Sequence, residues 1–225
     1  MSHAAIDPTL PNVRVIVNNG VRIEGAGGTP VVYVDPYLIE GEPRDADLVL
    51  VTHEHHDHLS PDDVARVSRE GTVLVGPAAM AERVGAVPVG ETYLVAPGET
   101  LEVAGVAVEA VPAYNTHPDR AHCHPREYGG LGYVIALDGV RYYVAGDTDP
   151  NEDIERVVCD VALVPVGGTY TMDVGQAAAF VNGLRPAVAV PTHYGCVAGT
   201  PDDGEAFAAL VDDGIAVAVK LERFR

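Results

Sequence analysis

The sequence predicts a single-domain α/β protein, and three observations lead to this fold class. The chain has 225 residues, a length that builds one substantial core but is short for two. Short apolar segments rich in β-branched residues recur along it, separated by Gly, Pro and Asp, which is typical of strands. Helical signals are fewer, and no linker, low-complexity stretch or block of like charge divides the chain. We therefore expect one domain over residues 1–225.

The expected strands are short apolar segments bounded by turn residues. They consist mainly of Val, Ile, Leu, Ala and Tyr, and their β-branched and aromatic members suit the pleated surface of a sheet. In chain order they are Val13–Val17, Val31–Val34, Leu48–Thr52, Val73–Val75, Val106–Val111, Tyr133–Leu137, Tyr142–Ala145, Val161–Pro165, Val188–Val190 and Ile215–Val219.

The clearest helix start is the segment Ser60-Pro61-Asp62-Asp63. Serine suits the N-cap, proline suits the first helical position, and the two aspartates favour the positive end of the helix dipole. Because strands outnumber helices, we expect sheets packed together with the helices outside. The other expected helices are Ala78–Val84, Asp173–Leu184 and Asp203–Asp212.

The charge balance excludes several kinds of partner. Asp and Glu number 33 against 14 basic residues, so the formal net charge is -19. Such a chain lacks the broad basic surface that binds nucleic acid or anionic lipid. The hydrophobic fraction of 47% is that of a folded protein, yet Lys220 is the only lysine. A folded acidic protein with so little lysine suggests a halophilic host, where salt screens the self-repulsion.

Nothing in the sequence indicates a membrane-bound or secreted protein. No apolar run approaches the roughly 20 residues that span a bilayer, and the first residues, MSHAAIDPTLPN, have neither a basic start nor an apolar stretch. Cys123, Cys159 and Cys196 are widely spaced and odd in number, which fits reduced thiols better than a disulfide framework. We expect a cytoplasmic protein, and its oligomeric state stays open.

The segment Thr52-His53-Glu54-His55-His56-Asp57-His58 indicates a metal site directly after a strand. A strand alternates its side chains, so His53 and His55 can share one face and bind one ion. The turn that follows would bring Asp57 and His58 toward a second ion. Imidazole with carboxylate suits zinc, manganese or iron, whereas a structural zinc site would carry paired thiolates. The alternative is a surface His-rich tract, but such tracts usually lie at termini or in low-complexity sequence.

Two later strand ends carry further ligand types. The segment Tyr142–Asp149 runs from a strand into Gly146-Asp147, where a carboxylate could bridge two cations. The segment Val188–Gly195 places His193 in the same way. Singly these signals are weak, because a strand-end Asp is commonly a turn former and a strand-end His is commonly structural. Three such strand ends in order predict one metal centre.

These motifs resemble the metallo-β-lactamase superfamily. The pattern His-X-His-X-Asp-His at residues 53–58, a later His, a Gly-Asp and a final His spans residues 53 to 193. Other stretches are similar to a branch of small prokaryotic hydrolases, close to zinc-dependent ones and to the lactonase UlaG. These stretches are Ala113-Tyr114-Asn115, Gly132-Tyr133, Ala145–Asp149, Gly167–Met172 and His193-Tyr194-Gly195. The resemblance covers nearly the whole chain and implies a four-layer αββα sandwich.

The resemblance also implies two divalent metal ions, with zinc as the first choice and manganese or iron as alternatives. His53 and His55 would bind the first ion, and Asp57 and His58 the second. Asp147 would bridge both ions. His193 would complete the second site.

The third ligand of the first ion departs from the broad family pattern. Most of the family places a histidine directly after the strand that here ends at Ala113, where this chain has Tyr114 and Asn115. We expect His124 to take the role, because its His-Pro-Arg context resembles an element of the branch. The other candidates are His117, His122 and, as an oxygen ligand, Asn115.

The expected reaction is hydrolysis of an ester, lactone, thioester or phosphodiester bond in a small molecule. Two close cations lower the pKa of a bridging water, which gives a hydroxide nucleophile near neutral pH. Asp57 would orient this water or accept its proton. Tyr170 and Tyr194 each lie beside a motif and are candidate hydrogen-bond donors to substrate, with aromatic packing as the alternative.

Two other classes of protein use the same scaffold. A diiron redox protein of this kind carries a flavin domain, for which the chain has no room, and usually an acidic ligand at the first ion. A non-catalytic or metal-sensing protein would follow if the third ligand of the first ion were missing. The motifs favour the hydrolase over both alternatives.

Overall fold

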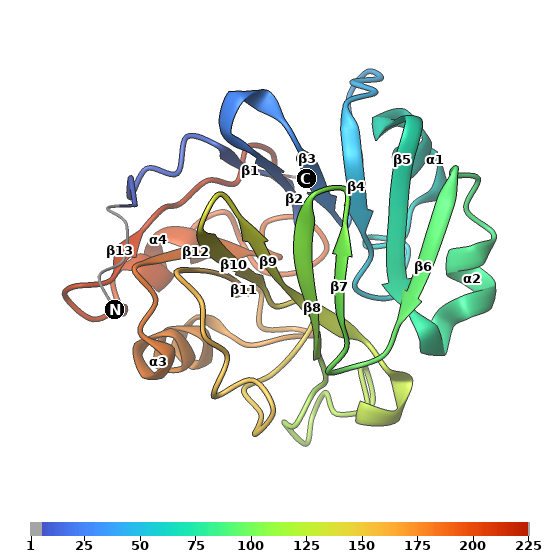
Figure 1. The fold of residues 1–225 in the computed structure, drawn as a ribbon. Coiled ribbons are helices and arrows are strands. Elements are labelled where there is room, and N and C mark those ends of the chain that lie inside the picture. The colour runs from blue at the N-terminus through green and yellow to red at the C-terminus, as the bar shows by residue number, and fades with distance from the viewer. Residues whose placement is uncertain (1–5, 225) are drawn as a thin grey trace.

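Two β-sheets form the centre of the molecule in the computed structural model, which describes residues 6–224 (Figure 1). The first sheet contains β1 (Val13–Val17), β2 (Gly20–Glu24), β3 (Val31–Val34), β4 (Ala46–Leu50), β5 (Ser68–Pro77) and β6 (Glu91–Val95), in this order. The second contains β7 (Thr100–Val103), β8 (Val106–Pro112), β9 (Leu131–Leu137), β10 (Val140–Val144), β11 (Val161–Pro165), β12 (Val188–Thr192) and β13 (Ala216–Val217), again in chain order across the sheet.

Each sheet has an antiparallel part and a parallel part. Strands β1 to β3 pair antiparallel and β3 to β6 pair parallel. In the second sheet β7 to β10 pair antiparallel and β10 to β13 pair parallel. Parallel strands present their carboxyl ends at one edge, which is where ligands bind in α/β sheets. The loops after β4, β10 and β12 leave from these ends and carry the three predicted motifs.

Helices cover the outer faces of both sheets (Figure 1). Helices α1 (Pro61–Val67) and α2 (Ala81–Gly85) pack on the first sheet, and α3 (Val174–Leu184) and α4 (Asp203–Ala208) pack on the second. The alternation of β4 shows the layers: Leu48 and Leu50 belong to the large core, and Val49 packs with apolar residues of α1 and α2. This is the predicted four-layer αββα sandwich. Short 3-10 segments lie in the connections between elements: η1 (Ala26–Gly28) between β2 and β3, η2 (Ala78–Met80) between β5 and α2, and η3 (Arg126–Tyr128) between β8 and β9.

Two helices begin at the capping residues that the sequence contains for them. The Ser60 Oγ accepts a hydrogen bond from the Asp63 N–H, and Pro61 begins α1. Asp173 and Gln176 form a reciprocal capping box at the start of α3. A cap of this kind stabilises a helix by about 1 kcal/mol. At α1 it also fixes the end of the histidine-rich loop that precedes the helix.

Strand β4 ends two residues before the predicted boundary at Thr52. The Thr52 N–H donates to the Asp35 carboxylate at 2.8 Å rather than to a neighbouring strand. His53 therefore lies in a loop and not on a strand. The loop brings His53 close to His55. The predicted cause, the alternation of side chains along a strand, is therefore wrong.

Other boundaries also differ from the predictions. The helix predicted over Ala78–Val84 is a 3-10 turn followed by α2, and the helix predicted over Asp203–Asp212 ends at Ala208. The strand predicted over Ile215–Val219 is reduced to β13. Strands β2, β6 and β7 were not predicted.

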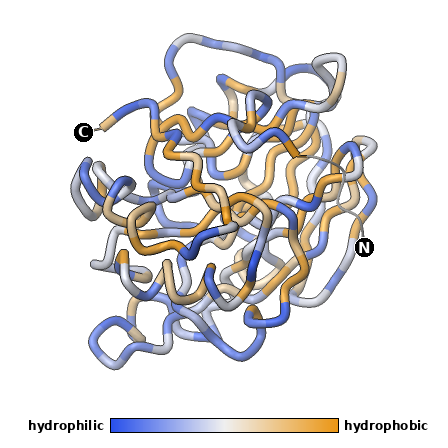
Figure 2. The backbone as a smooth tube through the Cα atoms, turned by 90° about the vertical axis from the view of Figure 1, so that its left-hand side faces the viewer, coloured by the Kyte–Doolittle hydropathy of each residue, from blue (hydrophilic) through white to orange (hydrophobic). Residues whose placement is uncertain are grey.

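Hydrophobic residues gather in the strands at the middle of the molecule, and hydrophilic residues in its peripheral loops (Figure 2). No helix among residues 6–224 combines the length and the apolar character that a bilayer crossing requires. No disulfide joins cysteines in the part of the chain that the structure describes. Of the N-terminal segment predicted to lack a secretory signal, residues 1–5 lie outside the described residues.

Candidate metal centre

A tight turn in the loop after β4 gives the histidine-rich segment its shape. The N–H groups of His58 and Leu59 both donate to the carbonyl of His55, at 2.9 and 2.8 Å. The turn reverses the chain between His55 and His58, so side chains from its two sides approach a common point. His53 and His58 lie with ring centroids 4.0 Å apart.

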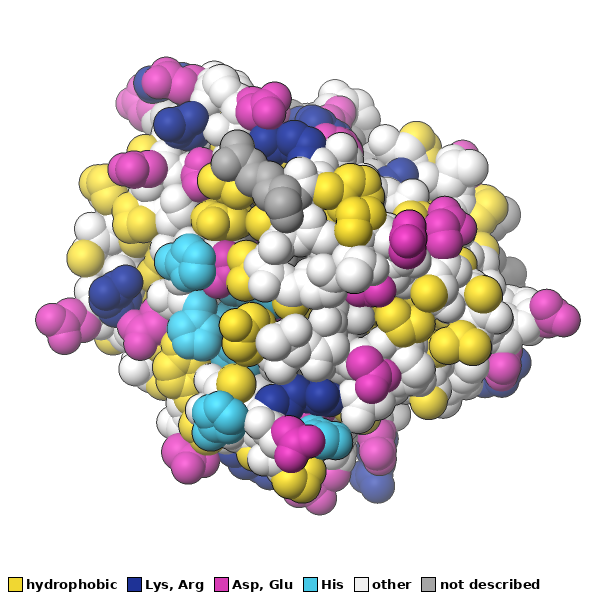
Figure 3. All heavy atoms as spheres, turned by 180° about the vertical axis from the view of Figure 1, so that it is seen from behind, with side chains coloured by type: hydrophobic (Ala, Val, Ile, Leu, Met, Phe, Trp, Pro, Cys, Tyr) yellow, Lys and Arg dark blue, Asp and Glu magenta, His cyan; other side chains and the backbone are white. Residues whose placement is uncertain are grey.

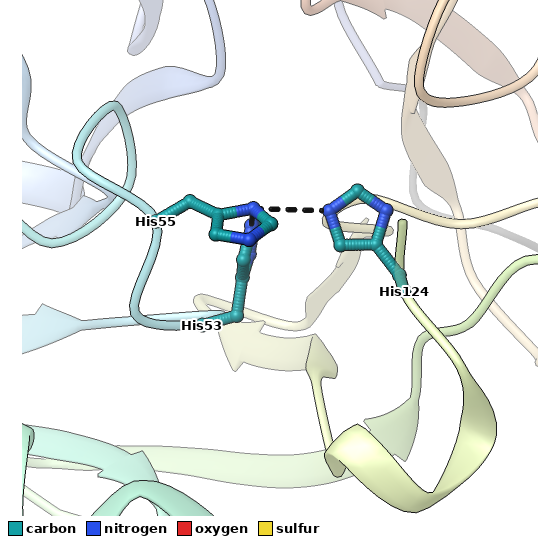
Figure 4. Close-up of side chains that lie close together, drawn as sticks. All are labelled: His53, His55 and His124. Atoms are coloured by element: carbon teal, nitrogen blue, oxygen red, sulfur yellow. Dashed lines mark hydrogen bonds between the residues drawn. The ribbon is translucent and has the colours of Figure 1, made fainter. Parts of the chain in front are cut away.

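Three imidazoles form what we call the first half-site: His53, His55 and His124. The Nδ1 atom of His55 lies 3.0 Å from Nε2 of His53 and 3.2 Å from Nε2 of His124. Figure 4 shows the three rings directed toward one another, two from the loop after β4 and His124 from the loop between β8 and β9. The ligand atoms lie within 4.8 Å of one another, as a single cation requires.

Asp57, His58 and His193 form what we call the second half-site. The Oδ2 atom of Asp57 lies 3.3 Å from Nε2 of His58 and 3.5 Å from Nε2 of His193. All three side chains are buried. His193 follows β12 with a left-handed backbone (φ 54°), and its N–H donates to the Asn18 carbonyl at 2.9 Å.

The Asp147 carboxylate, which follows β10, lies between the two half-sites. Its Oδ2 is 3.4 Å from Nε2 of His124 and 3.3 Å from Nε2 of His193. Its Oδ1 is 3.4 Å from Nε2 of His58. One carboxylate thus faces nitrogen atoms of both half-sites, which is the position that the sequence predicts for a bridging ligand.

Outer hydrogen bonds orient several of the rings. Nδ1 of His58 lies 2.7 Å from Oδ2 of Asp35, a carboxylate that also accepts from the Thr52 hydroxyl. Nδ1 of His124 lies 2.8 Å from Oδ1 of Asn115. When Nδ1 carries the hydrogen, the Nε2 lone pair is left to bind a cation. The role of Asp35 was not predicted from the sequence, although this residue also follows an apolar strand.

Some polar atoms at the centre have no hydrogen-bond partner among the described residues. They include Nε2 of His58, Nε2 of His193 and Oδ1 of Asp147, all buried. Buried polar atoms without partners are costly. Two nitrogen atoms and a carboxylate oxygen that face one another form the donor set of a zinc-like cation. The residues therefore fit a bound metal ion.

The two half-sites also differ in their protonation. Burial lowers the pKa of His124 to about 4, and burial together with neighbouring histidines lowers that of His53. Burial would lower the pKa of His193 as well, but the Asp147 and Asp57 carboxylates together outweigh it and raise the pKa to about 9. The pKa of His58 is raised in the same way by Asp147 and Asp35. The histidines of the second half-site therefore retain a second proton to higher pH than those of the first.

A cavity of about 300 Å³ opens above the centre. Figure 3 shows several histidine side chains gathered on one side of the corresponding face of the molecule. The lining residues are His55, His56, Asp57, Cys123, His124, Asp147, Tyr170, His193 and Val197. The volume is suited to a small molecule.

Six of the nine predicted site residues line this cavity, and His53 and His58 belong to the metal centre beneath it. Tyr170 is 39% exposed on its wall, whereas Tyr194 does not line it. The Tyr194 ring is buried and packs against Phe224 with centroids 6.2 Å apart, and its hydroxyl lies next to Gly204 of α4. This position corrects the predicted contact with substrate and favours the alternative, aromatic packing.

The other candidates for the third ligand of the first half-site lie elsewhere. The Nδ1 atom of His117 accepts a hydrogen bond from the Asp119 N–H, and His122 is exposed beside Cys123. Asn115 reaches the centre only through His124. Among the three histidines of this loop, His124 alone is grouped with His53 and His55.

Comparison with known proteins identifies the class. The model of the β-lactamase superfamily domain matches residues 12–193. A UPF0173 metal-dependent hydrolase of Thermococcus onnurineus is 34% identical over 209 residues, which cover 85% of this chain and 89% of the relative. The chain therefore belongs to the metallo-β-lactamase superfamily, within the family of UPF0173 metal-dependent hydrolases.

Solved structures agree with this fold. A protein of Parabacteroides distasonis is 31% identical, with a TM-score of 0.78 over 93% of both chains. CmlA, a diiron β-hydroxylase of Streptomyces venezuelae, has a TM-score of 0.68 at 15% identity, over 93% of this chain and 52% of its own. The second likeness concerns the fold alone. The predicted superfamily and the αββα sandwich are confirmed.

Proposed function

We propose that this metal-dependent hydrolase uses two divalent ions, preferably zinc, to cleave an ester, lactone, thioester or phosphodiester bond of a small molecule. The observation that carries the proposal is the convergence of two half-sites on one shared carboxylate, Asp147, beneath an open cavity. When bound, such ions supply an activated water and polarise the bond that is cleaved.

The histidines are arranged to bind cations rather than to transfer protons. The outer nitrogen atoms of His53, His58 and His124 lie 3.1, 2.7 and 2.8 Å from Thr52, Asp35 and Asn115. Their inner nitrogen atoms remain directed to the centre. Imidazole and carboxylate ligands without thiolates suit zinc in a catalytic site, with manganese and iron as alternatives.

Asp57 is the residue that we assign to proton transfer. Its Oδ2 accepts a hydrogen bond from Asn18 at 2.9 Å and faces the histidines of the second half-site. Its Oδ1 has His56 at 3.7 Å as its neighbour and belongs to a side chain that lines the cavity. We therefore assign Oδ1 to orient the attacking water and accept its proton.

Tyr170 is the remaining cavity residue suited to bind substrate. Its side chain is exposed on the cavity wall, and we assign its hydroxyl to donate a hydrogen bond to the oxygen on which negative charge develops. The acidic chain, with a net charge of -19, disfavours nucleic acid as substrate or partner. A cytoplasmic location follows as a proposal from the cysteine content.

The diiron redox function is the competing interpretation, and the ligand set opposes it. The first half-site has three imidazoles and no carboxylate of its own. The carboxylate ligand usual in the flavin-dependent diiron enzymes is therefore missing. We keep oxygen consumption as an outcome of the test.

The test is a substrate screen on untagged protein reconstituted with zinc, manganese or iron in high salt. We expect two equivalents of metal by elemental analysis and turnover within a panel of lactones, thioesters, esters and phosphodiesters. Tyr170→Phe should lower turnover about tenfold or more, and the matched control Tyr194→Phe should not. Two bound ions without turnover, or oxidised iron with oxygen consumption, would contradict the proposal.

A further inference from the structure

The loop that carries His124 is closed by backbone hydrogen bonds that continue the pairing of β8 with β9. At its base the Ala113 N–H donates to the Gly130 carbonyl at 2.9 Å. Further out, the Asn115 N–H donates to the carbonyl of His124 at 2.8 Å. The backbone of His124 is therefore fixed next to Asn115, at the level of the metal centre.

The Asn115 side chain holds the ring of His124 as well. Its Oδ1 lies 2.8 Å from Nδ1 of His124, and the two side chains are buried. An amide oxygen only accepts, so Nδ1 carries the hydrogen of this bond. The Nε2 lone pair then faces Oδ2 of Asp147 at 3.4 Å. Asn115 thus determines both the tautomer and the direction of the ring.

Asp149 fastens the outer part of the same loop. Its carboxylate is 1% exposed and accepts from the N–H groups of Thr116 and His117, at 2.9 Å each. The guanidinium of Arg120 lies against the other oxygen at 2.6 Å and compensates the buried charge. Since Asp149 follows Asp147 by two residues, one strand end supplies both a predicted ligand and the anchor of the loop.

These contacts coincide with the departure from the broad family pattern. The residues directly after β8 include Asn115 where most of the family has a histidine, and the candidate ligand comes from His124 further along a loop. A loop without fastenings would lose conformational entropy on ordering around an ion, which weakens binding. The contacts of Asn115 and Asp149 reduce this loss, because they order the loop before the ion arrives.

We propose that Asn115 and Asp149 are positioning residues that hold His124 ready for the ion of the first half-site. The inference rests on the proposed function, because it takes His124 as a ligand. A merely structural role predicts a less stable loop with unchanged metal binding. A positioning role predicts weaker binding at the first half-site alone.

The test compares Asn115→Leu with Asn115→Asp by chelator competition and by the visible spectrum of the cobalt-substituted protein. Leucine removes the acceptor, and we expect a 10–100-fold weaker first half-site with an unchanged second one. Aspartate also accepts from Nδ1–H, so it should restore binding. The matched control is Asn12→Leu, which removes hydrogen bonds to the Glu24 carbonyl and the Tyr142 hydroxyl far from the centre. It should leave both affinities unchanged.

A second variant keeps the proposal testable if Asn115→Leu fails to fold. The double substitution Asp149→Leu with Arg120→Met removes the acceptor of the Thr116 and His117 N–H groups without leaving an unpaired buried charge, and it should weaken the first half-site in the same direction. Two ions bound at wild-type affinity in these variants would overturn the inference alone. Wild-type protein that takes up no ion at the first half-site would overturn the proposed function and this inference together.

Discussion

The two half-sites share Asp147, yet they differ in charge and burial. The first consists of three imidazoles, of which His55 is exposed. The side chains of the second are all buried, and they include the Asp57 carboxylate. A cation in the second half-site therefore meets a negative ligand of its own in a less hydrated setting, where the attraction is stronger. We infer that the second half-site binds its ion more tightly.

The hydrogen-bond acceptors behind the histidine rings also favour tighter binding at the second half-site. His58 of the second half-site donates to a carboxylate, Asp35, whereas His124 of the first donates to an amide, Asn115. A carboxylate acceptor increases the basicity of the imidazole more than a neutral one does. Two ions bound at these half-sites would therefore not be equivalent, and we expect them to bind in sequence.

The largest effect is expected from the shared ligand. Asp147→Asn removes a buried charge that faces both half-sites. Loss of an outer support costs 10–100-fold in metal affinity, so loss of this carboxylate should cost more than about 100-fold at both ions. Elemental analysis after dialysis would measure it. Retention of two ions would refute the bridging role.

Removal of one ligand should separate the half-sites. His124→Ala should leave one tightly bound ion, and so should His193→Ala, but the ion that remains should be held more tightly in His124→Ala. The reason is that this variant keeps the carboxylate-containing half-site. Calorimetric titration with zinc measures both affinities. If His124→Ala still bound two ions with unchanged affinity, His124 would not be a ligand. If the remaining ions of the two variants bound with equal affinity, the second half-site would not be the tighter one.

Removal of the carboxylate that supports His58 should reduce the difference in metal affinity between the two half-sites. Asp35→Asn takes the charge from the acceptor of His58, and we expect the second half-site to weaken 10–100-fold while the first is unchanged. Asp63→Asn is a matched control, because Asp63 is also a buried carboxylate that accepts backbone N–H groups, those of Leu38 and Ile39. Equal effects of the two variants on zinc affinity would contradict the role of Asp35.

Acidity should affect the half-sites differently. Burial would lower the pKa values of His58 and His193, but the facing carboxylates outweigh it and raise both, that of His193 to about 9, so these rings retain a second proton to higher pH than a free imidazole. An ion must displace these protons, so affinity at the second half-site should rise about tenfold per pH unit for each proton released. The first half-site, with the pKa of His124 at about 4, should be nearly flat above about pH 5.

The same titration has a consequence for the metal-free protein. The folded pKa of His193 lies above its ordinary 6.5, so its contribution to stability is fully present below that pH and is lost as pH rises through about 9. Thermal unfolding of metal-free protein between pH 6 and 9 would measure this loss. Calorimetric metal titrations in buffers of different ionisation enthalpy would count the protons released on metal binding. Equal proton release from both half-sites would contradict the predicted difference in their protonation.

The residues at the centre could be predicted because ligand chemistry is local. His53, His55, Asp57 and His58 lie in one loop, and Asp147 follows a strand as the motif requires. The supports could not be predicted in this way. Asp35 contacts His58 only because parallel strands β3 and β4 end side by side, and a strand-end aspartate on its own resembles any turn residue.

The strands that were missed lack a long apolar run. Strand β2 begins with glycine and contains Arg22 and Glu24, which form an ion pair on its polar side. Strands β6 and β7 lie at sheet edges, and Tyr93 and Leu94 of β6 are more than a third exposed. Edge strands need no continuous hydrophobic sequence, so pattern alone cannot separate them from loops.

The hydrogen bonds between Asn115 and His124 also fix the position of His124 whatever the length of the loop that precedes it. Residues 118 to 122 lie between fixed points, with His117 held by Asp149 and His124 held by Asn115. Doubling the length of a flexible loop costs only about 0.6 kcal/mol of closure entropy. The segment that leads to the cavity-lining Cys123 can therefore be lengthened without moving the imidazole, provided that Arg120 stays paired with Asp149. This makes the segment a natural place to redesign substrate choice.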